Sequence, residues 1–280
     1  MQGIIVINAF SGIGEHQAER LVAEFKKLGV QVRKVYNRIG EVPYEGIDFA
    51  IFLDKDIYTA RKLEKAGVRV FNSANAIEVC DDKLYTDLAL QSKVKTPLTI
   101  ASSFSYTDDA PISDEELNFI IDKLGLPLVF KLPKQSLGKG VYLIESRDEL
   151  KEYIAKYRTT RHLYQKFIAS SAGQDIRVIT VGGNVIASMQ RVNSKDFRSN
   201  VEVGGLGVPC SINEQIQDMA IKVSKELNLD YCGIDFLIDS DGSALVCEVN
   251  SNAFFKGIES VSGVNVASAY CNHVLKVLND

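Results

Sequence analysis

Apolar positions divide the chain into stretches with different strand and helix patterns. In the first stretch, residues 3–10 and 47–53 are nearly continuous apolar runs, typical of strands covered on both faces. Between them, residues 15–29 carry apolar side chains at helical spacing and end at Gly29. Alternation of strands and helices predicts a small parallel sheet over residues 1–95.

Two further stretches follow, and they have different patterns. Residues 96–165 predict strands around a polar glycine loop, with a helix that Ser113 caps and Gly125 ends. Residues 166–280 are rich in antiparallel hairpin signals and contain two helical patterns. The chain is therefore expected to combine an α/β layer with α+β units.

Composition and charge narrow the class of protein. The chain is 46% hydrophobic with a net charge of −4, so nucleic acid is not expected as its main partner. No apolar run approaches the roughly 20 residues that cross a bilayer, and a secretory signal pattern is missing, so we expect no membrane partner. Five cysteines without CxxC spacing favour a reducing, cytoplasmic location over disulfides or zinc. Homo-oligomer formation is left open.

Acids and amides interrupt the last two apolar strands, residues 231–238 and 245–250. The segment between them contains Asp241–Gly242, a strong two-residue hairpin turn. With that turn as the loop, Leu237 is expected opposite Val246. The other pairs along the hairpin follow by counting outward from the turn, and the alternation of side chains in a strand then gives the face on which each residue lies.

The same register predicts Asp235 opposite Glu248, with Asn250 on the same face. Like charges directly opposite one another destabilise a sheet. A hard cation between them removes the repulsion, and Mg²⁺ prefers oxygen ligands, with phosphates or waters completing its shell. The pattern therefore indicates a magnesium–nucleotide site, and a solvent-facing hairpin is the alternative.

Arginine residues accompany this hairpin. Arg177 alternates with Asp175 on one predicted strand, and Arg198 follows in the segment DFRSN. An ideal hairpin at Gly182–Gly183 puts Arg191 on the opposite face from Arg177, so Arg191 needs a bulge or a strand end to join it. The guanidinium group of arginine can donate two parallel hydrogen bonds to a phosphate or a carboxylate, although a lone arginine is more often a surface charge.

Glycine loops occur at two places. Gly138 and Gly140 follow the strand that ends at Lys131, and their backbone N–H groups could cover phosphates. Lys131 could also extend to water from the strand end. Residues 10–17, FSGIGEHQ, lack the third glycine of a dinucleotide-binding fingerprint, so a tight turn is favoured there.

In chain order, the segments PLVFK, SLGKG, YQKFI, DIRVITVGG, DFRSN, GIDFLI and CEVNSN resemble the ATP-grasp superfamily, and DFRSN with the end of the chain resembles the RimK-like glutamate ligases. The resemblance covers roughly residues 75–280. It implies an ATP-grasp fold with a Rossmann-like pre-grasp domain at 1–95. The implied lid subdomain is 96–165, and the large subdomain with the magnesium–nucleotide site is 166–280.

The resemblance also implies roles for single residues. The expected ATP-binding residues, with the glycines of the loop, are Lys83, Lys131, Gly138, Gly140, Gln165, Lys166, Phe167, Asp175, Arg198, Ser199 and Asn200. Lys131 and Arg198 are expected to be catalytic. The expected ligands of Mg²⁺ or Mn²⁺ are Asp235, Glu248 and Asn250, and the substrate-binding candidates are Arg177, Arg191 and Lys256.

Two positions depart from the family pattern. Lys166 stands where relatives usually carry an acid, which puts a side-chain contact to adenine in doubt. SNAFFKG replaces a small proline-containing turn, so Phe254, Phe255 and Lys256 are expected to shape a different substrate pocket. A plain surface position for Lys256 remains an alternative.

The activity implied is ATP-dependent ligation of a carboxylate to an amine through an acyl phosphate. Glutamate or another amino acid would supply the amine, and a peptide or protein C-terminus or a small molecule would supply the carboxylate. Three alternatives stay open: a dipeptide ligase, a non-catalytic ATP-binding module, and a dehydrogenase built on the N-terminal layer. The incomplete glycine fingerprint argues against the dehydrogenase.

Overall fold

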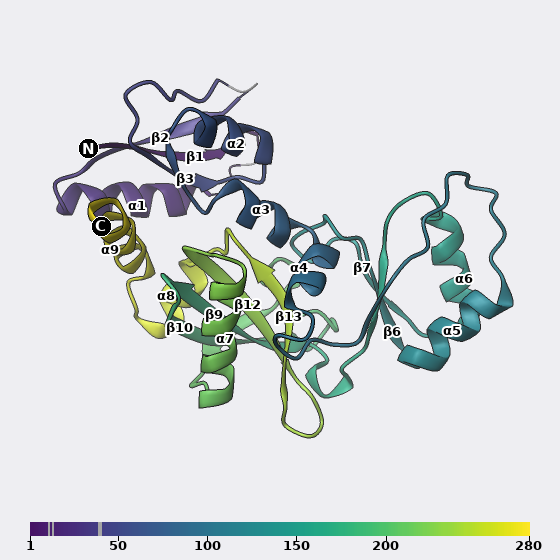
Figure 1. The fold of residues 1–280 in the computed structure, drawn as a ribbon. Coiled ribbons are helices and arrows are strands. Elements are labelled where there is room, and N and C mark those ends of the chain that lie inside the picture. The colour runs from purple at the N-terminus through teal and green to yellow at the C-terminus, as the bar shows by residue number, and fades with distance from the viewer. Residues whose placement is uncertain (11, 13, 39–40) are drawn as a thin grey trace.

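Three sheets make up the computed structural model, which describes residues 1–10, 12, 14–38 and 41–280 (Figure 1). The N-terminal sheet is parallel, in the order β2-β1-β3-β4. Its strands are β1 (Gln2–Asn8), β2 (Gln31–Asn37), β3 (Phe49–Leu53) and β4 (Arg69–Phe71). The glycine-rich turn expected at residues 10–17 lies partly outside the described residues, because Ser11 and Ile13 are not among them.

Helices cover both faces of the N-terminal sheet, and for this reason its strands read as continuous apolar runs. Ile5 and Ile7 of β1 pack toward α1 (Glu15–Lys27), while Ile4 and Val6 pack toward α2 (Ile57–Lys65). All four side chains are fully buried, and each stabilises the fold by about 1.5–3 kcal/mol. Helices α3 (Ala74–Asp81) and α4 (Lys83–Leu90), which the sequence patterns did not indicate, follow β4.

The second sheet is antiparallel, in the order β5-β8-β6-β7, and lies at the far end of the molecule from the N-terminal sheet (Figure 1). Its strands are β5 (Thr99–Ala101), β6 (Leu128–Lys131), β7 (Val141–Ile144) and β8 (Leu163–Lys166). Helices α5 (Asp114–Leu124) and α6 (Arg147–Lys156) pack on it. The hydroxyl of Ser113 accepts a hydrogen bond from Glu116 N at 3.1 Å, which confirms the predicted helix cap.

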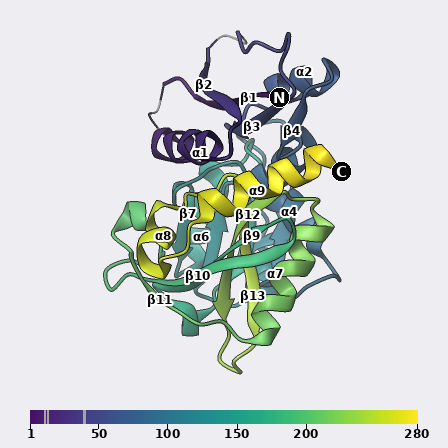
Figure 2. The same ribbon diagram turned by 90° about the vertical axis from the view of Figure 1, so that its left-hand side faces the viewer.

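The third sheet has five antiparallel strands in the order β11-β10-β9-β12-β13. The strands are β9 (Gln174–Val181), β10 (Asn184–Val192), β11 (Leu206–Pro209), β12 (Tyr231–Ile238) and β13 (Ala244–Asn250). Its short 3₁₀ helices are η1 (Ala169–Ser171) and η2 (Val201–Val203), and its α-helices are α7 (Glu214–Glu226), α8 (Lys256–Ser262) and α9 (Val266–Asn279). Helix α7 covers one face, and α8 with α9 covers part of the other (Figure 2).

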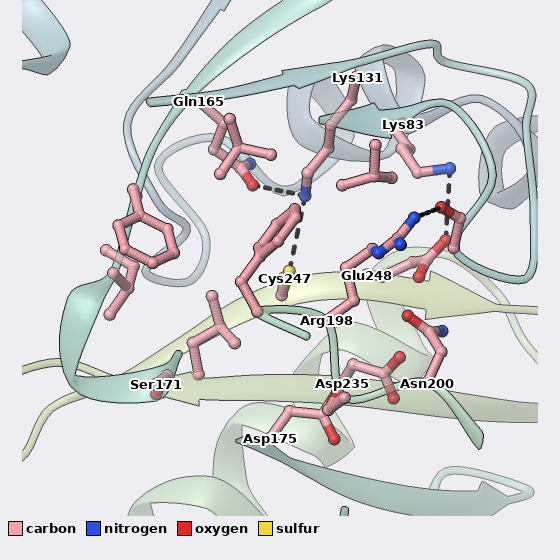
Figure 3. A pocket seen from close by; sticks show the side chains of 18 of the residues that line it. Lys83, Lys131, Gln165, Ser171, Asp175, Arg198, Asn200, Asp235, Cys247 and Glu248 are labelled. Atoms are coloured by element: carbon pink, nitrogen blue, oxygen red, sulfur yellow. Dashed lines mark hydrogen bonds and ion pairs between the residues drawn. The ribbon is translucent and has the colours of Figure 1, made fainter. Parts of the chain in front are cut away.

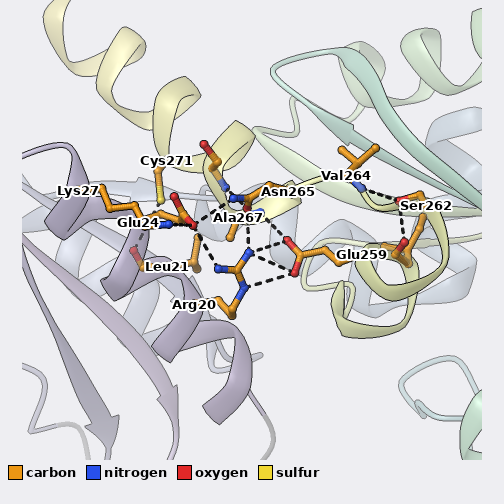
Figure 4. A network of polar contacts seen from close by, with 12 residues as sticks. Arg20, Leu21, Glu24, Lys27, Glu259, Ser262, Val264, Asn265, Ala267 and Cys271 are labelled. Atoms are coloured by element: carbon orange, nitrogen blue, oxygen red, sulfur yellow. Dashed lines mark hydrogen bonds and ion pairs between the residues drawn. The ribbon is translucent and has the colours of Figure 1, made fainter.

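Helix α9 also packs against α1 and so joins the third sheet to the N-terminal sheet. A polar network accompanies this contact (Figure 4). Arg20 on α1 donates to the Glu259 carboxylate at 3.3 Å and to Asn265 Oδ1 at 2.9 Å. Glu24 accepts hydrogen bonds from Arg20 and Lys27. The two sheets are therefore held by charge as well as by apolar contact.

A second connection fixes the end of β4 against the third sheet. The side chain of Asn72 is buried and forms four hydrogen bonds to the backbone. Its Nδ2 donates to the carbonyl oxygens of Tyr231 at 2.7 Å and Ser251 at 2.8 Å, and its Oδ1 accepts from the N–H groups of Asp230 and Tyr231. Since Ser251 directly follows β13, Asn72 positions the segment that leaves that strand.

Within the described residues, no helix has the length and apolar character needed to cross a membrane.

Candidate functional site

Two cavities meet where the three sheets come together. We call the first the lid cavity; it has a volume of about 100 Å³ and lies between the second and third sheets. We call the second the edge cavity; it has a volume of about 380 Å³ and lies at the ends of β1, β3 and β13. The residues that line both cavities are Ser136, Arg191, Asn200 and Glu248.

Two lysines that the resemblance implies as ATP-binding residues, Lys83 and Lys131, line the lid cavity (Figure 3). Lys131, the last residue of β6, donates to Gln165 Oε1 at 2.6 Å and lies 3.7 Å from the sulfur of Cys247. Burial raises the pKa of the Cys247 thiol, which therefore stays neutral beside the lysine. Lys83 begins α4, and its Nζ lies 3.4 Å from Glu248 Oε1. Two cations thus face a space lined by polar groups.

The strand end at 165–167 forms one wall of the lid cavity. Gln165 uses its carbonyl for Lys131 and its amide nitrogen for Thr99 Oγ1 at 3.0 Å. The side chain of Lys166 is exposed, while its backbone N–H donates to Leu98 O at 2.9 Å. Phe167 packs edge-to-face on Phe197. The wall thus combines backbone, one amide and aromatic rings, a composition that suits a flat heteroaromatic base.

The predicted glycine loop closes over the lid cavity. Gly138 and Gly140 have φ angles of 75° and 67°, which favour glycine. A Cβ at Gly140 would also lie 2.9 Å from Gln135 Cγ. Arg198 donates from Nη1 to the carbonyl oxygen of Gly138 at 2.7 Å, and Asp196 holds the same guanidinium through two hydrogen bonds. Arg198 therefore connects the loop to the third sheet.

The β12–β13 hairpin corrects the predicted register. Asp239 N donates to Ser243 O at 2.9 Å, so the turn is longer than the two residues expected. Leu237 consequently lies opposite Leu245, and the expected pairing with Val246 is wrong. An irregularity that leaves Cys247 without a partner on β12 then shifts the register back.

Asp235 and Glu248 are opposite one another, as expected. The carboxylate of Asp235, however, is buried and ion-paired with Arg177 and Arg191. Burial would raise the pKa of Asp235, but the two guanidinium charges outweigh burial and hold that pKa below its usual value. Glu248 is half-buried and pairs with Lys83. The two carboxylates thus face different cations.

The predicted metal set consists of two carboxylates and an amide. No group of three His, Cys, Asp or Glu side chains in the described part of the chain could by itself hold a metal ion. Asn250 has a buried Nδ2 without a hydrogen-bond partner. An amide can turn its oxygen to the same position, so Asn250 can offer a ligand there beside Glu248. The assignment of Asp235, Glu248 and Asn250 to a metal stays a prediction.

A bulge places Arg191 beside Arg177. The β9–β10 register shifts between Val185 and Ala187, and beyond the shift Arg191 lies opposite Asp175. Arg177 and Arg191 therefore share a face, which the ideal hairpin does not allow. Arg191 Nε donates to Asp175 Oδ1 at 2.8 Å.

Asp175 lies deep in the lid cavity. The hydroxyl of Ser199 donates to Asp175 Oδ2 at 2.6 Å. Burial and the negative charge of Asp235 raise the pKa of Asp175, while the charge of Arg191 opposes them. Ser199 and Asn200 also line this cavity, next to the glycine loop.

The segment after β13 is arranged differently from expectation. Phe254 lines the edge cavity, but Phe255 is buried in the core against Tyr231. Lys256, the first residue of α8, is exposed and lines a separate cavity of about 250 Å³ with Gln17. Of these three residues, Phe254 alone lines the lid cavity or the edge cavity, and the expected role of the three in substrate binding stays a prediction.

Sequence reasoning did not identify the contribution of the N-terminal sheet to the edge cavity. The residues from this sheet and its connections are Asn8, Leu53, Asp54, Lys55, Cys80 and Asp81. The carboxyl ends of parallel strands are the usual place for ligands in α/β folds. Asn8, the last residue of β1, and Asp54, which follows β3, were therefore a usable signal.

Comparison with known proteins gives clear matches. A family model of the RimK-like ATP-grasp domain matches residues 80–274. N-acetylaspartylglutamate synthase A from Homo sapiens is 35% identical over 230 residues, which cover 80% of this chain and 57% of that protein. A probable alpha-L-glutamate ligase from Maridesulfovibrio salexigens is 35% identical over 222 residues, which cover 77% of this chain and 70% of that protein. The chain thus spans less than two thirds of the human relative.

A solved structure confirms the expected fold. The crystal structure of D-alanine–D-alanine ligase from Bacillus anthracis complexed with ATP aligns with 100% of this chain and 97% of its own, at a TM-score of 0.78. Its sequence identity is 18%, so the match concerns the fold alone. The ATP-grasp fold class predicted from the ordered motifs is therefore correct.

Proposed function

Because the chain belongs to the RimK-like ATP-grasp family, we propose that it is an ATP-dependent ligase that joins a carboxylate to an amine. The observation that carries this proposal is that the lid cavity and the edge cavity share Glu248, Asn200 and Arg191 in their walls. A nucleotide whose phosphates reach this junction meets whatever the edge cavity holds. Phosphoryl transfer requires this proximity.

The lid cavity is proposed as the ATP site. The base would lie along Gln165, Lys166 and Phe167, where aromatic and backbone groups form the wall. Lys83 and Lys131 would neutralise phosphate charge from the side of the second sheet. Arg198 would do so from the third sheet, and its hydrogen bond to Gly138 would hold the glycine loop closed.

The oxygen groups at the junction fit a divalent ion. Glu248 and Asn250 lie two residues apart and therefore on the same side of β13, and Asn250 has an unpartnered polar atom. Asp235 is opposite Glu248 and would become the third ligand if one of its oxygens exchanged its arginine partner for the metal. Mg²⁺, or Mn²⁺ in its place, supplies charge neutralisation of the phosphates when bound. Apart from neutralising charge, the side chains of the protein would act by holding the substrates in the correct position.

The proposed reaction has two steps. An oxygen of the substrate carboxylate attacks the γ-phosphorus of ATP, the bond to the β-phosphate oxygen breaks, and ADP leaves. The amine nitrogen then attacks the acyl carbon, loses a proton, and displaces inorganic phosphate to leave an amide. Lys131 and Arg198 would offset charge in the first step. The closed glycine loop would exclude water, which otherwise hydrolyses the acyl phosphate.

Glutamate is the first amine to test. The human relative is named for a product that contains glutamate, and the bacterial relative is named a probable glutamate ligase. Those names support an amino acid as the amine here. The matching carboxylates to test are N-acetyl-L-aspartate, which forms part of the human relative's name, and peptides with a free C-terminus.

The test is phosphate release from ATP and Mg²⁺ in the presence of paired carboxylates and amines, with mass spectrometry of the products. We expect release that depends on both partners and a product mass equal to the sum of the two minus water. A reaction without the amine controls for hydrolysis of the acyl phosphate. If ATP binds and no pair stimulates release, the chain is a nucleotide-binding module instead of a ligase.

A further inference from the structure

The charged side chains that line the edge cavity are balanced by ion pairs, with one exception in the part of the chain that the structure describes. The balanced pairs are Lys55 with Asp81, Glu248 with Lys83, Arg177 with Asp235, and Arg191 with Asp175 and Asp235. Asp54 lines the same cavity, and no described lysine, arginine or histidine forms an ion pair with it. A carboxylate without a counter-ion in a cavity attracts a cation.

Neutral groups hold the Asp54 carboxylate in place. Its Oδ2 accepts hydrogen bonds from the side-chain amides of Asn37 at 3.1 Å and Asn8 at 3.5 Å. Its Oδ1 accepts from Lys55 N at 2.7 Å. These donors fix the orientation of the carboxylate and leave its negative charge uncancelled. The residue directly follows β3, so it lies at the carboxyl edge of the parallel sheet.

A second acceptor lines the same cavity. Asn252 has a buried Oδ1 for which the described residues supply no hydrogen-bond partner. The segment that carries it is held firmly: a side chain at Gly233 would overlap Ala253, and the Tyr231 hydroxyl donates to Ala253 O at 2.6 Å. A buried polar atom without a partner costs free energy, and a donor on a ligand removes that cost.

We propose that the edge cavity binds the ammonium group of an α-amino acid, with Asp54 and Asn252 as its acceptors. An ammonium group supplies both the positive charge that Asp54 lacks and the donor that Asn252 lacks. Arg177 and Arg191 line the same cavity; their ion pairs use Nε and Nη2, so Nη1 of each would donate to the carboxylate of the amino acid. This assignment rests on the proposed ligase function, in which the amino acid is the amine that meets the acyl phosphate.

The test compares L-glutamate with glutarate, which has the same two carboxylates but no amino group. Binding of each acid is measured by titration calorimetry in the presence of Mg²⁺ and a non-hydrolysable ATP analogue. We expect the wild type to bind L-glutamate at least about tenfold more tightly than glutarate, since a charge-assisted hydrogen bond is lost with the amino group. Asp54→Asn should remove most of this preference.

Two matched variants sharpen the result. Asp48→Asn removes the same charge at the opposite end of β3, where Asp48 is exposed, and should keep the preference for L-glutamate. At the second acceptor, Asn252→Asp should keep or strengthen the preference, while Asn252→Leu should weaken it. The two Asn252 variants still test the ammonium site if Asp54→Asn fails to fold, because they change a different segment of the chain.

The outcomes separate the site from the reaction. Equal affinity for the two acids, or no detectable binding of either, overturns the ammonium site even if ligase turnover is found. An unchanged preference in both Asp54→Asn and Asn252→Leu overturns it as well. A preference for L-glutamate that disappears in these variants, without ADP release for any pair of substrates, supports the site and contradicts the ligase function.

Discussion

Arg191 on β10 reaches across β9 to place its Nη2 2.8 Å from Asp235 Oδ2 on β12. The same guanidinium pairs with Asp175, and Arg177 binds both oxygens of the Asp235 carboxylate. Two arginines and two aspartates thus alternate beneath the junction of the two cavities. All four are nearly inaccessible to solvent, so each charge depends on its neighbours.

Removal of Arg191 is expected to destabilise the protein. Arg191→Ala leaves Asp175 and Asp235 close together without the cation that lies between them. Loss of one partner from a buried ion pair costs about 3–5 kcal/mol, and we expect a loss of that size in the free energy of unfolding. Urea denaturation followed by circular dichroism measures it.

A surface pair is the control for this prediction. Arg147 pairs with Asp114, whose side chain is 85% exposed, so Arg147→Ala should change the free energy of unfolding by less than about 1 kcal/mol. If Arg191→Ala were no more destabilising than this control, the buried network would not be what holds the third sheet together at this point.

Glu248 is expected to control the dependence on Mg²⁺. Glu248→Gln keeps the size of the side chain and removes the charge that faces the junction. We expect the Mg²⁺ concentration for half-maximal turnover to rise at least about tenfold, and turnover by Glu248→Ala to be abolished. The side chain is half-buried and pairs with Lys83 at 3.4 Å, so folding should be largely retained. An unchanged Mg²⁺ concentration for half-maximal turnover in Glu248→Gln, or near-normal turnover by Glu248→Ala with Mg²⁺ as the only metal, would refute the ligand assignment.

Arg198 is expected to hold the glycine loop. Its hydrogen bond to the Gly138 carbonyl joins the loop to the third sheet. Arg198→Ala should weaken ATP binding about tenfold or more, because a charge-assisted hydrogen bond and a phosphate contact are lost together. It should also speed proteolytic cleavage within residues 134–140. Titration calorimetry and limited proteolysis measure the two effects.

Lys134→Ala is the matched variant for the loop, since Lys134 is exposed and lines neither cavity. It removes a positive charge from the same loop and should leave both measurements close to wild type. Equal effects of the two substitutions would mean that net charge, and not the Arg198 contact, governs closure.

The sequence predicted the Asp235–Glu248 pairing through two errors that cancel. A longer turn at Asp239–Ser243 shifts the register by one residue, and the unpaired Cys247 shifts it back. Turn length and bulges depend on details of backbone conformation that the amino-acid sequence predicts only weakly. The strand pattern was sufficient for the sheet itself, because alternation and apolar runs depend only on which faces are buried.

The edge cavity could not be read from the sequence in the same way. Its lining comes from segments as far apart as Asn8 and Phe254, and their approach depends on how α1 packs on α9. The shift near Ile186 likewise decides whether Arg191 faces the site, and its sequence contains no glycine or proline to mark it. Contacts between distant segments are set by packing, which local patterns do not encode.

The network between α1 and α9 predicts a pH dependence of stability (Figure 4). Hydrogen bonds from Lys27 and Asn265, with that from Arg20, lower the pKa of Glu24 from 4.5 to about 2. Because the pKa is lower in the folded state, Glu24 stabilises the protein fully above pH 4.5. That stabilisation is lost as the pH falls from 4.5 through about 2.

Glu24→Gln tests this contribution by thermal unfolding at a series of pH values. The Tm of the wild type should exceed that of the variant at pH 7, and the difference should shrink steadily as the pH falls below 4.5, because protonation then removes the same charge from the wild type. Glu19→Gln on the same helix is the control, since Glu19 is 69% exposed and should contribute little at any pH. A difference for Glu24→Gln that stays constant down to pH 2.5 would show that the carboxylate charge has no part in joining α1 to α9.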